Sequence, residues 1–154
     1  MGAVRALGRL VKRIGHSSEP EFQSLAAMAM YNLGNALSNA AALTEAMSMY
    51  DQVIERFGHS DQRLLRNLVA MAMFNKGVQL QELGRTDEEI ATYNLLLERI
   101  ADAADPVLLH QAAKALNSKG IALGTLGRHE EEIGTYQQLI DQFQDSGDIQ
   151  LSDR

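Results

Sequence analysis

The chain has 154 residues, of which 45% are hydrophobic but only 5% aromatic, a mix that favours helices over sheets. It contains no cysteine, which excludes disulfides and cysteine-based metal sites. No apolar run approaches the roughly 20 residues that span a bilayer, which argues against membrane insertion. A formal net charge of −6 argues against a general nucleic-acid binder.

The first segment, residues 3–21, is basic and amphipathic. Leu7, Leu10 and Ile14 fall at helical spacing, and basic side chains lie on the other side: Arg5, Arg9, Lys12 and Arg13. A transit peptide can have this composition. However, the segment aligns with residues 46–64 at an offset of 43, so that Gly15-His16-Ser17 falls on Gly58-His59-Ser60. We therefore interpret it as the second half of an earlier repeat, and we expect a cytoplasmic protein.

Three copies of one pattern follow, with a period of 43 residues. Phe74 to Tyr93 returns as Asn117 to Tyr136, and a weaker copy runs from Tyr31 to Tyr50. A fixed period of this size marks an array of stacked units in a single repeat domain. The predicted units are a leading half repeat (3–21), repeat 1 (22–64), repeat 2 (65–107), repeat 3 (108–150) and a tail (151–154).

Each repeat predicts a helical hairpin. In repeat 2 the first helix is expected from about Arg63 to Leu83, and the second from about Thr86 to Ile100. Gly84 ends the first helix by taking a left-handed conformation, as Gly127 does in repeat 3. Ala41 replaces this glycine in repeat 1, which predicts a turn of different shape. The apolar stripes need neighbouring repeats to bury them: Leu65, Val69, Met73, Leu80, Leu83, Ile90, Tyr93, Leu96, Leu97 and Ile100.

The helix starts carry signals of their own. Thr86 and Glu89 have the spacing of a capping box, and the acidic runs 87–89 and 130–132 favour the positive end of a helix dipole. Asp105 and Pro106 suit the N-cap and the first helical position. In the polar tail that starts at Gln144, a fourth repeat begins and stops. These elements predict an all-α solenoid of about seven helices.

The repeats resemble the tetratricopeptide repeat (TPR). Matching residues are Leu33-Gly34, Leu37, Ala46 and Tyr50 in repeat 1, Met73, Gly77, Leu80 and Tyr93 in repeat 2, and Leu116, Gly120, Leu123 and Tyr136 in repeat 3. The resemblance covers nearly the whole chain and implies a right-handed solenoid of stacked antiparallel hairpins. Because the family's period is about 34 residues, the first helix of each pair must be longer here, as in a bacterial-style long-repeat relative.

Repeats 2 and 3 depart from the TPR pattern at one paired position. Leu33 and Ala46 of repeat 1 are replaced by Lys76 and Glu89 in repeat 2, and by Lys119 and Glu132 in repeat 3. We expect each lysine to meet its glutamate across the hairpin or between neighbouring repeats. The alternative is that all four are solvated surface charges.

No residue pattern predicts catalysis, a cofactor or a metal, so we do not expect an enzyme. The four histidines are dispersed, and His129 with Glu132 has no third ligand nearby in sequence. The acidic runs have a sufficient structural role at helix starts. The glycines follow no strand and therefore form no phosphate-binding loop.

The resemblance implies a groove on the concave face, lined by one side of each first helix. Carried over position by position, its residues are Met28, Tyr31, Asn32, Asn35, Met71, Phe74, Asn75, Val78, Gln81, Lys114, Asn117, Ser118 and Ile121. Methionine and aromatic side chains suit adaptable contact with a peptide. The alternative places Met28, Met71 and Phe74 in the core between repeats.

Some TPR domains hold a peptide's terminal carboxylate with two lysines, two asparagines and an arginine. Asn35, Asn75 and Lys114 match three of these positions. Tyr31 and Ser118 replace two of the three cations, so we do not expect this clamp.

The sequence therefore predicts an interaction scaffold that binds a peptide or helix of a partner protein in the concave groove. One alternative is self-assembly, in which the basic first helix stacks on the acidic last repeat and gives a homo-oligomer. Another alternative is a regulatory or sensor segment of a larger multidomain protein.

Overall fold

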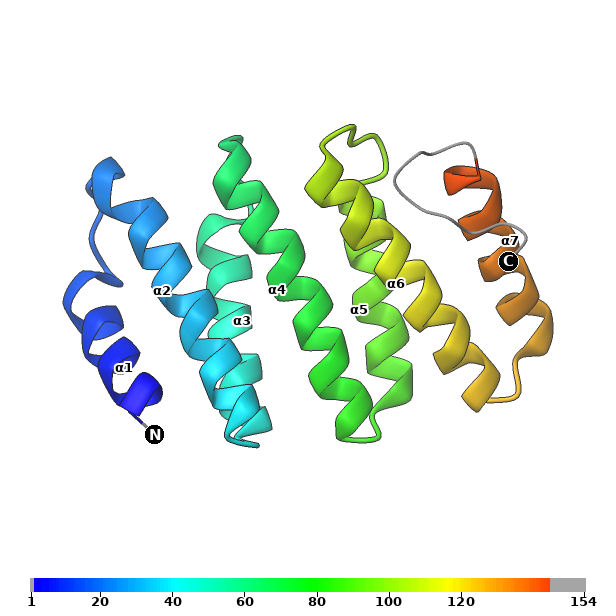
Figure 1. Cartoon of the computed structure of the whole chain (residues 1–154), viewed down its shortest axis with the longest axis horizontal. Helices are drawn as coiled ribbons and strands as arrows, with labels where there is room; N and C mark the ends of the chain where they lie inside the picture. Colours follow the sequence, from blue (N-terminus) through cyan, green and yellow to red (C-terminus); the bar gives the residue numbers. More distant parts are fainter. Residues whose placement is uncertain (1, 145–154) are drawn as a thin grey trace.

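Seven helices and no strand make up residues 2–144, the part of the chain that this computed structural model describes (Figure 1). Helices α2, α4 and α6 begin at Pro20, Arg63 and Pro106, and each begins 43 residues after the one before. Helices α3, α5 and α7 share this spacing. The bounds are α1 Gly2–Ile14, α2 Pro20–Asn39, α3 Leu43–Phe57, α4 Arg63–Glu82, α5 Thr86–Arg99, α6 Pro106–Thr125 and α7 His129–Phe143.

The helices form two layers. The first helices of the hairpins, α2, α4 and α6, contact one another in sequence, and each also packs against the second helices on either side of it. Figure 1 shows α1 at one end of the long axis and α7 at the other. The main buried cluster runs through the layers from Ala26 to Phe143, so stacking between repeats buries the apolar stripes. This is the helical solenoid expected from the sequence.

The turn inside each hairpin has the same backbone in all three repeats. Gly84 and Gly127 have φ angles of 72° and 74°, as expected, but Ala41 also adopts a left-handed φ of 61°. In each case the next amide donates to a carbonyl five residues back, as Arg85 N does to Leu80 O. The expectation that Ala41 would change the turn was therefore wrong. The hairpin geometry overrides the steric cost of a side chain in this region.

The helix starts follow one expectation and correct another. Asp105 is the N-cap of α6, because its carboxylate accepts a hydrogen bond from Val107 N at 2.8 Å. Thr86, by contrast, is the first residue of α5 and caps nothing; Arg85 stands at the N-cap and makes no side-chain capping bond. Arg85 binds Glu88 through two hydrogen bonds of 2.6 and 2.7 Å instead, and Glu89 turns towards the core.

A glycine under a tyrosine ring joins the two helices of each hairpin. A Cβ atom on Gly34 would lie 2.6 Å from Cε1 of Tyr50, and one on Gly77 or Gly120 would overlap the ring of Tyr93 or Tyr136 in the same way. The absent side chain lets the ring of the second helix rest on the backbone of the first. The residues of the predicted apolar stripes are buried or half-buried, with the exception of Leu83. This residue stands at the C-cap of α4 and is exposed.

Candidate partner-binding groove

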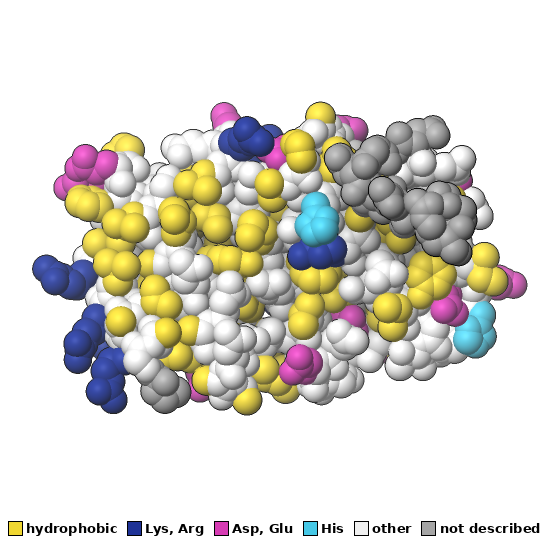
Figure 2. Space-filling model, viewed as in Figure 1, with side chains coloured by type: hydrophobic (Ala, Val, Ile, Leu, Met, Phe, Trp, Pro, Cys, Tyr) yellow, Lys and Arg dark blue, Asp and Glu magenta, His cyan; other side chains and the backbone are white. Residues whose placement is uncertain are grey.

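The exposed face of α2, α4 and α6 carries all thirteen of the predicted groove residues. None of them is buried: each is half-buried or exposed. Figure 2 shows this face, with hydrophobic side chains gathered over α2 and α4. A surface that holds apolar side chains in partial contact with water is suited to covering by a partner.

A pocket of about 360 Å³ lies between α2 and α4. Met28, Tyr31, Asn32 and Met71, all predicted groove residues, line it together with Leu64, Asn67, Leu68 and Val107. Met28 is 41% exposed, so this side chain is available at the surface. Phe74 is half-buried and packs against the core cluster, so it fits partly the groove and partly the core alternative; Tyr31, expected only in the groove, also packs against this cluster.

The four further pocket residues were missed because they lie outside the part of the first helix that carries the TPR pattern. Leu64 and Val107 occupy one repeat position, in the first turn of α4 and of α6. A signal was present: Leu64-Leu65 and Val107-Leu108 are adjacent apolar pairs. Only one residue of such a pair on a helix can face the hydrophobic core of the protein. Leu65 and Leu108 are the buried members, which leaves Leu64 and Val107 nearer the surface.

A polar network links α2, α3 and α4 beside the pocket. Asn35 Oδ1 accepts from the Tyr50 hydroxyl at 2.6 Å and from Asn75 Nδ2 at 3.0 Å. Asn75 Nδ2 also donates to Tyr31 Oη at 3.0 Å. Burial raises the pKa of Tyr50 to about 12, so this hydroxyl stays a donor at neutral pH. The network holds the two asparagines in contact with each other across the helices.

Further along the groove, one cation lies over an aromatic ring. Lys114 Nζ is 4.3 Å from the centroid of Phe74, and Phe74 stacks on Tyr93 at 5.6 Å. Burial lowers the pKa of Lys114, and none of the ion pairs formed within residues 2–144 includes this lysine. The ring therefore supplies its nearest favourable electrostatic contact.

The expected lysine–glutamate pairs are not formed, and this corrects the sequence interpretation. Lys76 Nζ lies 2.8 Å from Asp51 Oδ1, on the preceding repeat, and no ion pair within residues 2–144 joins Lys76 to Glu89 or Lys119 to Glu132. The charge of Lys76 acts instead on Glu88, whose pKa Arg85 chiefly lowers. Because successive helical residues are about 100° apart, Glu88 points out to its partner Arg85 while Glu89, one residue on, is buried in the hairpin.

Glu132 lies in the same register as Glu89 but keeps a different partner. Its Oε1 atom is 3.0 Å from His129 Nδ1. The carboxylate fills the space above Gly124, where a Cβ atom would be 2.7 Å from Oε2. The two glutamates are therefore packing residues of the hairpin rather than partners of the lysines.

The burial of Glu89 leads us to expect that the free energy of unfolding depends on pH. Its side chain is 2% exposed, and burial raises its pKa above the ordinary 4.5, partly opposed by Tyr93. Because this pKa is higher in the folded than in the unfolded state, Glu89 makes its full contribution to the free energy of unfolding below pH 4.5. This contribution is lost as the pH rises through the folded-state pKa. We expect Glu89→Gln to gain stability over wild type as the pH rises from 4 to neutrality. Urea unfolding across this range measures the difference, and parallel curves for the two proteins would refute the assignment.

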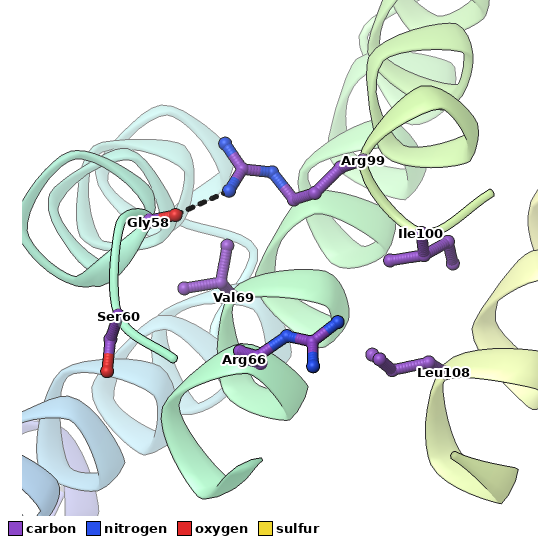
Figure 3. Close-up of a pocket in the computed structure, with 7 residues that line it drawn as sticks. All are labelled: Gly58, Ser60, Arg66, Val69, Arg99, Ile100 and Leu108. Atoms are coloured by element: carbon purple, nitrogen blue, oxygen red, sulfur yellow. Dashed lines mark hydrogen bonds between the residues drawn. The ribbon is translucent and has the colours of Figure 1, made fainter. Parts of the chain in front are cut away.

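A second hollow, of about 180 Å³, is lined by residues from the end of repeat 1, from repeat 2 and from the start of repeat 3 (Figure 3). Arg99 Nη1 donates to Gly58 O at 2.6 Å, and Arg56 Nη2 donates to Ser17 O at 2.6 Å one repeat earlier. Figure 3 shows the guanidinium of Arg66 pointing away from that of Arg99, on the other side of Val69. The guanidinium groups of Arg66 and Arg99 therefore do not converge on one ligand. The hydrogen bonds of Arg99 and Arg56 link their helices, α5 and α3, to the turn of the preceding repeat.

Within residues 2–144, no group of three or more His, Cys, Asp or Glu side chains could hold a metal ion. None of the helices formed by these residues is both long enough and apolar enough to cross a membrane. The predicted start of a fourth repeat, after Gln144, lies outside the described residues.

Comparison with known proteins gives one family match. Residues 28–60, from the middle of α2 to the turn after α3, match the family model of the tetratricopeptide repeat. A search of curated proteins found no match. The matched segment includes Met28, Tyr31, Asn32 and Asn35, which are the predicted groove residues on α2.

Proposed function

We propose that this chain, a TPR-like protein, is an interaction scaffold that holds a peptide or helix of a partner protein in the groove formed by α2, α4 and α6. TPR repeats generally mediate protein–protein interaction, and the family is generally not enzymatic. The observation that carries the proposal is the 360 Å³ pocket between α2 and α4, half of whose lining residues are groove residues implied by the TPR resemblance.

The chemistry of the pocket suggests how a partner segment would be held. Its walls are mainly Met, Leu, Val and Tyr, with Asn32 and Asn67 as the polar members. An apolar side chain of the partner would enter between Met28 and Met71, whose flexible thioethers adapt to different shapes. The two asparagine amides can hydrogen-bond to the main chain of the partner on either side of it.

Peptides selected against the wild-type protein from a random library provide the test. We expect Met71→Glu to weaken the binding of the selected peptides at least about tenfold, because a carboxylate would be buried in an apolar contact. Isothermal titration measures the affinities. Circular dichroism verifies that the variant is folded, which we expect because Met71 is only half-buried.

Leu95→Glu is the matched control. Leu95 is an exposed leucine on α5, in the other layer of helices, so the same charge is introduced away from the groove. We expect this variant to bind like wild type. If the selected peptides bind Met71→Glu as tightly as wild type, or lose affinity only for Leu95→Glu, the groove assignment is wrong.

A further inference from the structure

The two ends of the helix array expose apolar side chains at repeat positions that are buried inside it. Ile133 on α7 is 67% exposed, whereas Ile90, at the same position of α5, is 5% exposed. At the other end, Phe22 on α2 is 36% exposed and its counterpart Leu65 on α4 only 1%. A repeat array that remains soluble as a monomer usually carries a polar outer face on its terminal units. Within residues 2–144, the helices at both ends keep the apolar residues of interior repeats.

The exposed residues form a patch at each end. The leading patch consists of Phe22 and Leu25 on α2, beside the half-buried apolar side of α1. The trailing patch consists of Ile133 and Ile140 on α7. Inside the array, Leu68, the counterpart of Leu25, lies between α2 and α4 in the pocket described above. The leading patch is therefore the surface that a further helix would cover.

The helices at the two ends carry charges of opposite sign, and one acidic residue, Glu21 in the first turn of α2, lies next to Phe22 of the leading patch. Helix α1 carries Arg5, Arg9, Lys12 and Arg13 and no acidic residue, and all four side chains are exposed. Helix α7 carries Glu130, Glu131, Glu132 and Asp141 and no lysine or arginine. Figure 2 shows basic side chains grouped at the α1 end of the molecule; acidic side chains lie at the α7 end and also at other places on this face, the upper left among them.

We infer that the trailing patch of one molecule docks on the leading patch of a second copy, so that the protein associates head to tail. Apolar contact between Ile133, Ile140 and the side of α1 and α2 supplies the affinity. The acidic α7 and the basic α1 fix the orientation, since tail-to-tail or head-to-head contact would place like charges together. The contact joins two different surfaces, so it leaves a free patch at each end and does not close at a dimer.

Sedimentation velocity on the whole chain tests this inference. At low salt, we expect the weight-average mass to rise with concentration above the monomer value of 16.9 kDa, with no plateau at the dimer. Raising the salt to about 0.5 M is expected to weaken association several-fold through screening. Ile133→Ser is expected to weaken it at least about tenfold, whereas Leu95→Ser, on an exposed leucine of an interior helix, leaves it unchanged.

Two charge-reversed proteins test the pairing itself. Arg5→Glu with Arg9→Glu removes the net positive charge of α1 in one protein, which keeps its acidic α7, and Glu130→Lys with Asp141→Lys removes the net negative charge of α7 in the other, which keeps its basic α1. We expect each protein alone to be monomeric and a mixture of the two to associate again, because complementary ends are restored. A monomeric wild type at high concentration and low salt would overturn the inference. So would association that survives Ile133→Ser or fails to return in the mixture.

Discussion

Replacing Gly77 with alanine is expected to lower the free energy of unfolding by about 1–3 kcal/mol, the usual range for overpacking a core. A Cβ atom at this position would overlap the ring of Tyr93, which is completely buried and stacked on Phe74. The ring cannot move aside without disturbing the contact between the two helices. The loss is expected even though alanine is ordinarily the better helix former by about 1 kcal/mol.

Gly134→Ala is the matched control for this substitution. Gly134 also lies inside a helix, but nothing is within 4 Å of the position that its Cβ would take. There we expect the ordinary gain in stability of about 1 kcal/mol from alanine. Urea unfolding followed by circular dichroism measures both variants. Equal effects of the two substitutions would show that the glycine under the tyrosine has no packing role.

Leu65→Ala is expected to cost about 2–5 kcal/mol, the range for removing a fully buried leucine side chain. Leu65 is 1% exposed, near the start of α4, and it belongs to the core cluster that continues across the repeats. Its burial depends on the preceding repeat, because the equivalent Phe22 on α2 has no preceding first helix beside it and is 36% exposed. The substitution therefore tests stacking between repeats.

Phe22→Ala provides the comparison at the same repeat position. It removes a larger side chain, yet we expect a smaller loss of stability than for Leu65→Ala, because Phe22 gives up less buried surface. Chemical unfolding of both proteins under one set of conditions measures the difference. A larger loss for Phe22→Ala would mean that burial at this position does not come from stacking on the preceding repeat.

The helical array could be predicted because its signals are local and repeated. Gly84, Gly127 and the Asp105-Pro106 pair mark helix ends through backbone chemistry, and these marks recur at a constant spacing. The pair of a tyrosine ring and the glycine on which it rests recurs in all three repeats. Repetition turns weak single signals into a consistent assignment, since each copy tests the others. The right-handed twist of the solenoid stays a prediction.

Three features could not be predicted because they depend on tertiary geometry. Ala41 takes the conformation of the glycines since the hairpin imposes it. Lys76 pairs with Asp51 of the preceding repeat while Glu89 is buried, and the paired substitution in the sequence does not reveal this. Asn67 joins the pocket only because α2 and α4 lie side by side.

The repeat with the weakest internal similarity is the one that matches the family model. Repeat 1 keeps Leu33 and Ala46, both buried, where repeats 2 and 3 have Lys and Glu. Comparing the copies with one another therefore singled out repeats 2 and 3, whereas the family pattern is most complete in repeat 1. The same repeat supplies Met28 and Tyr31 to the pocket.

Methyl NMR of the methionines tests the binding groove most directly. The chain has seven methionines, and they include Met28 and Met71 in the pocket and Met47 and Met49 on α3, in the other layer. When a selected peptide is added, we predict that the methyl signals of Met28 and Met71 shift and that those of Met47 and Met49 do not. Shifts at Met49 with unchanged signals from Met28 and Met71 would place the peptide on the opposite face and contradict the account.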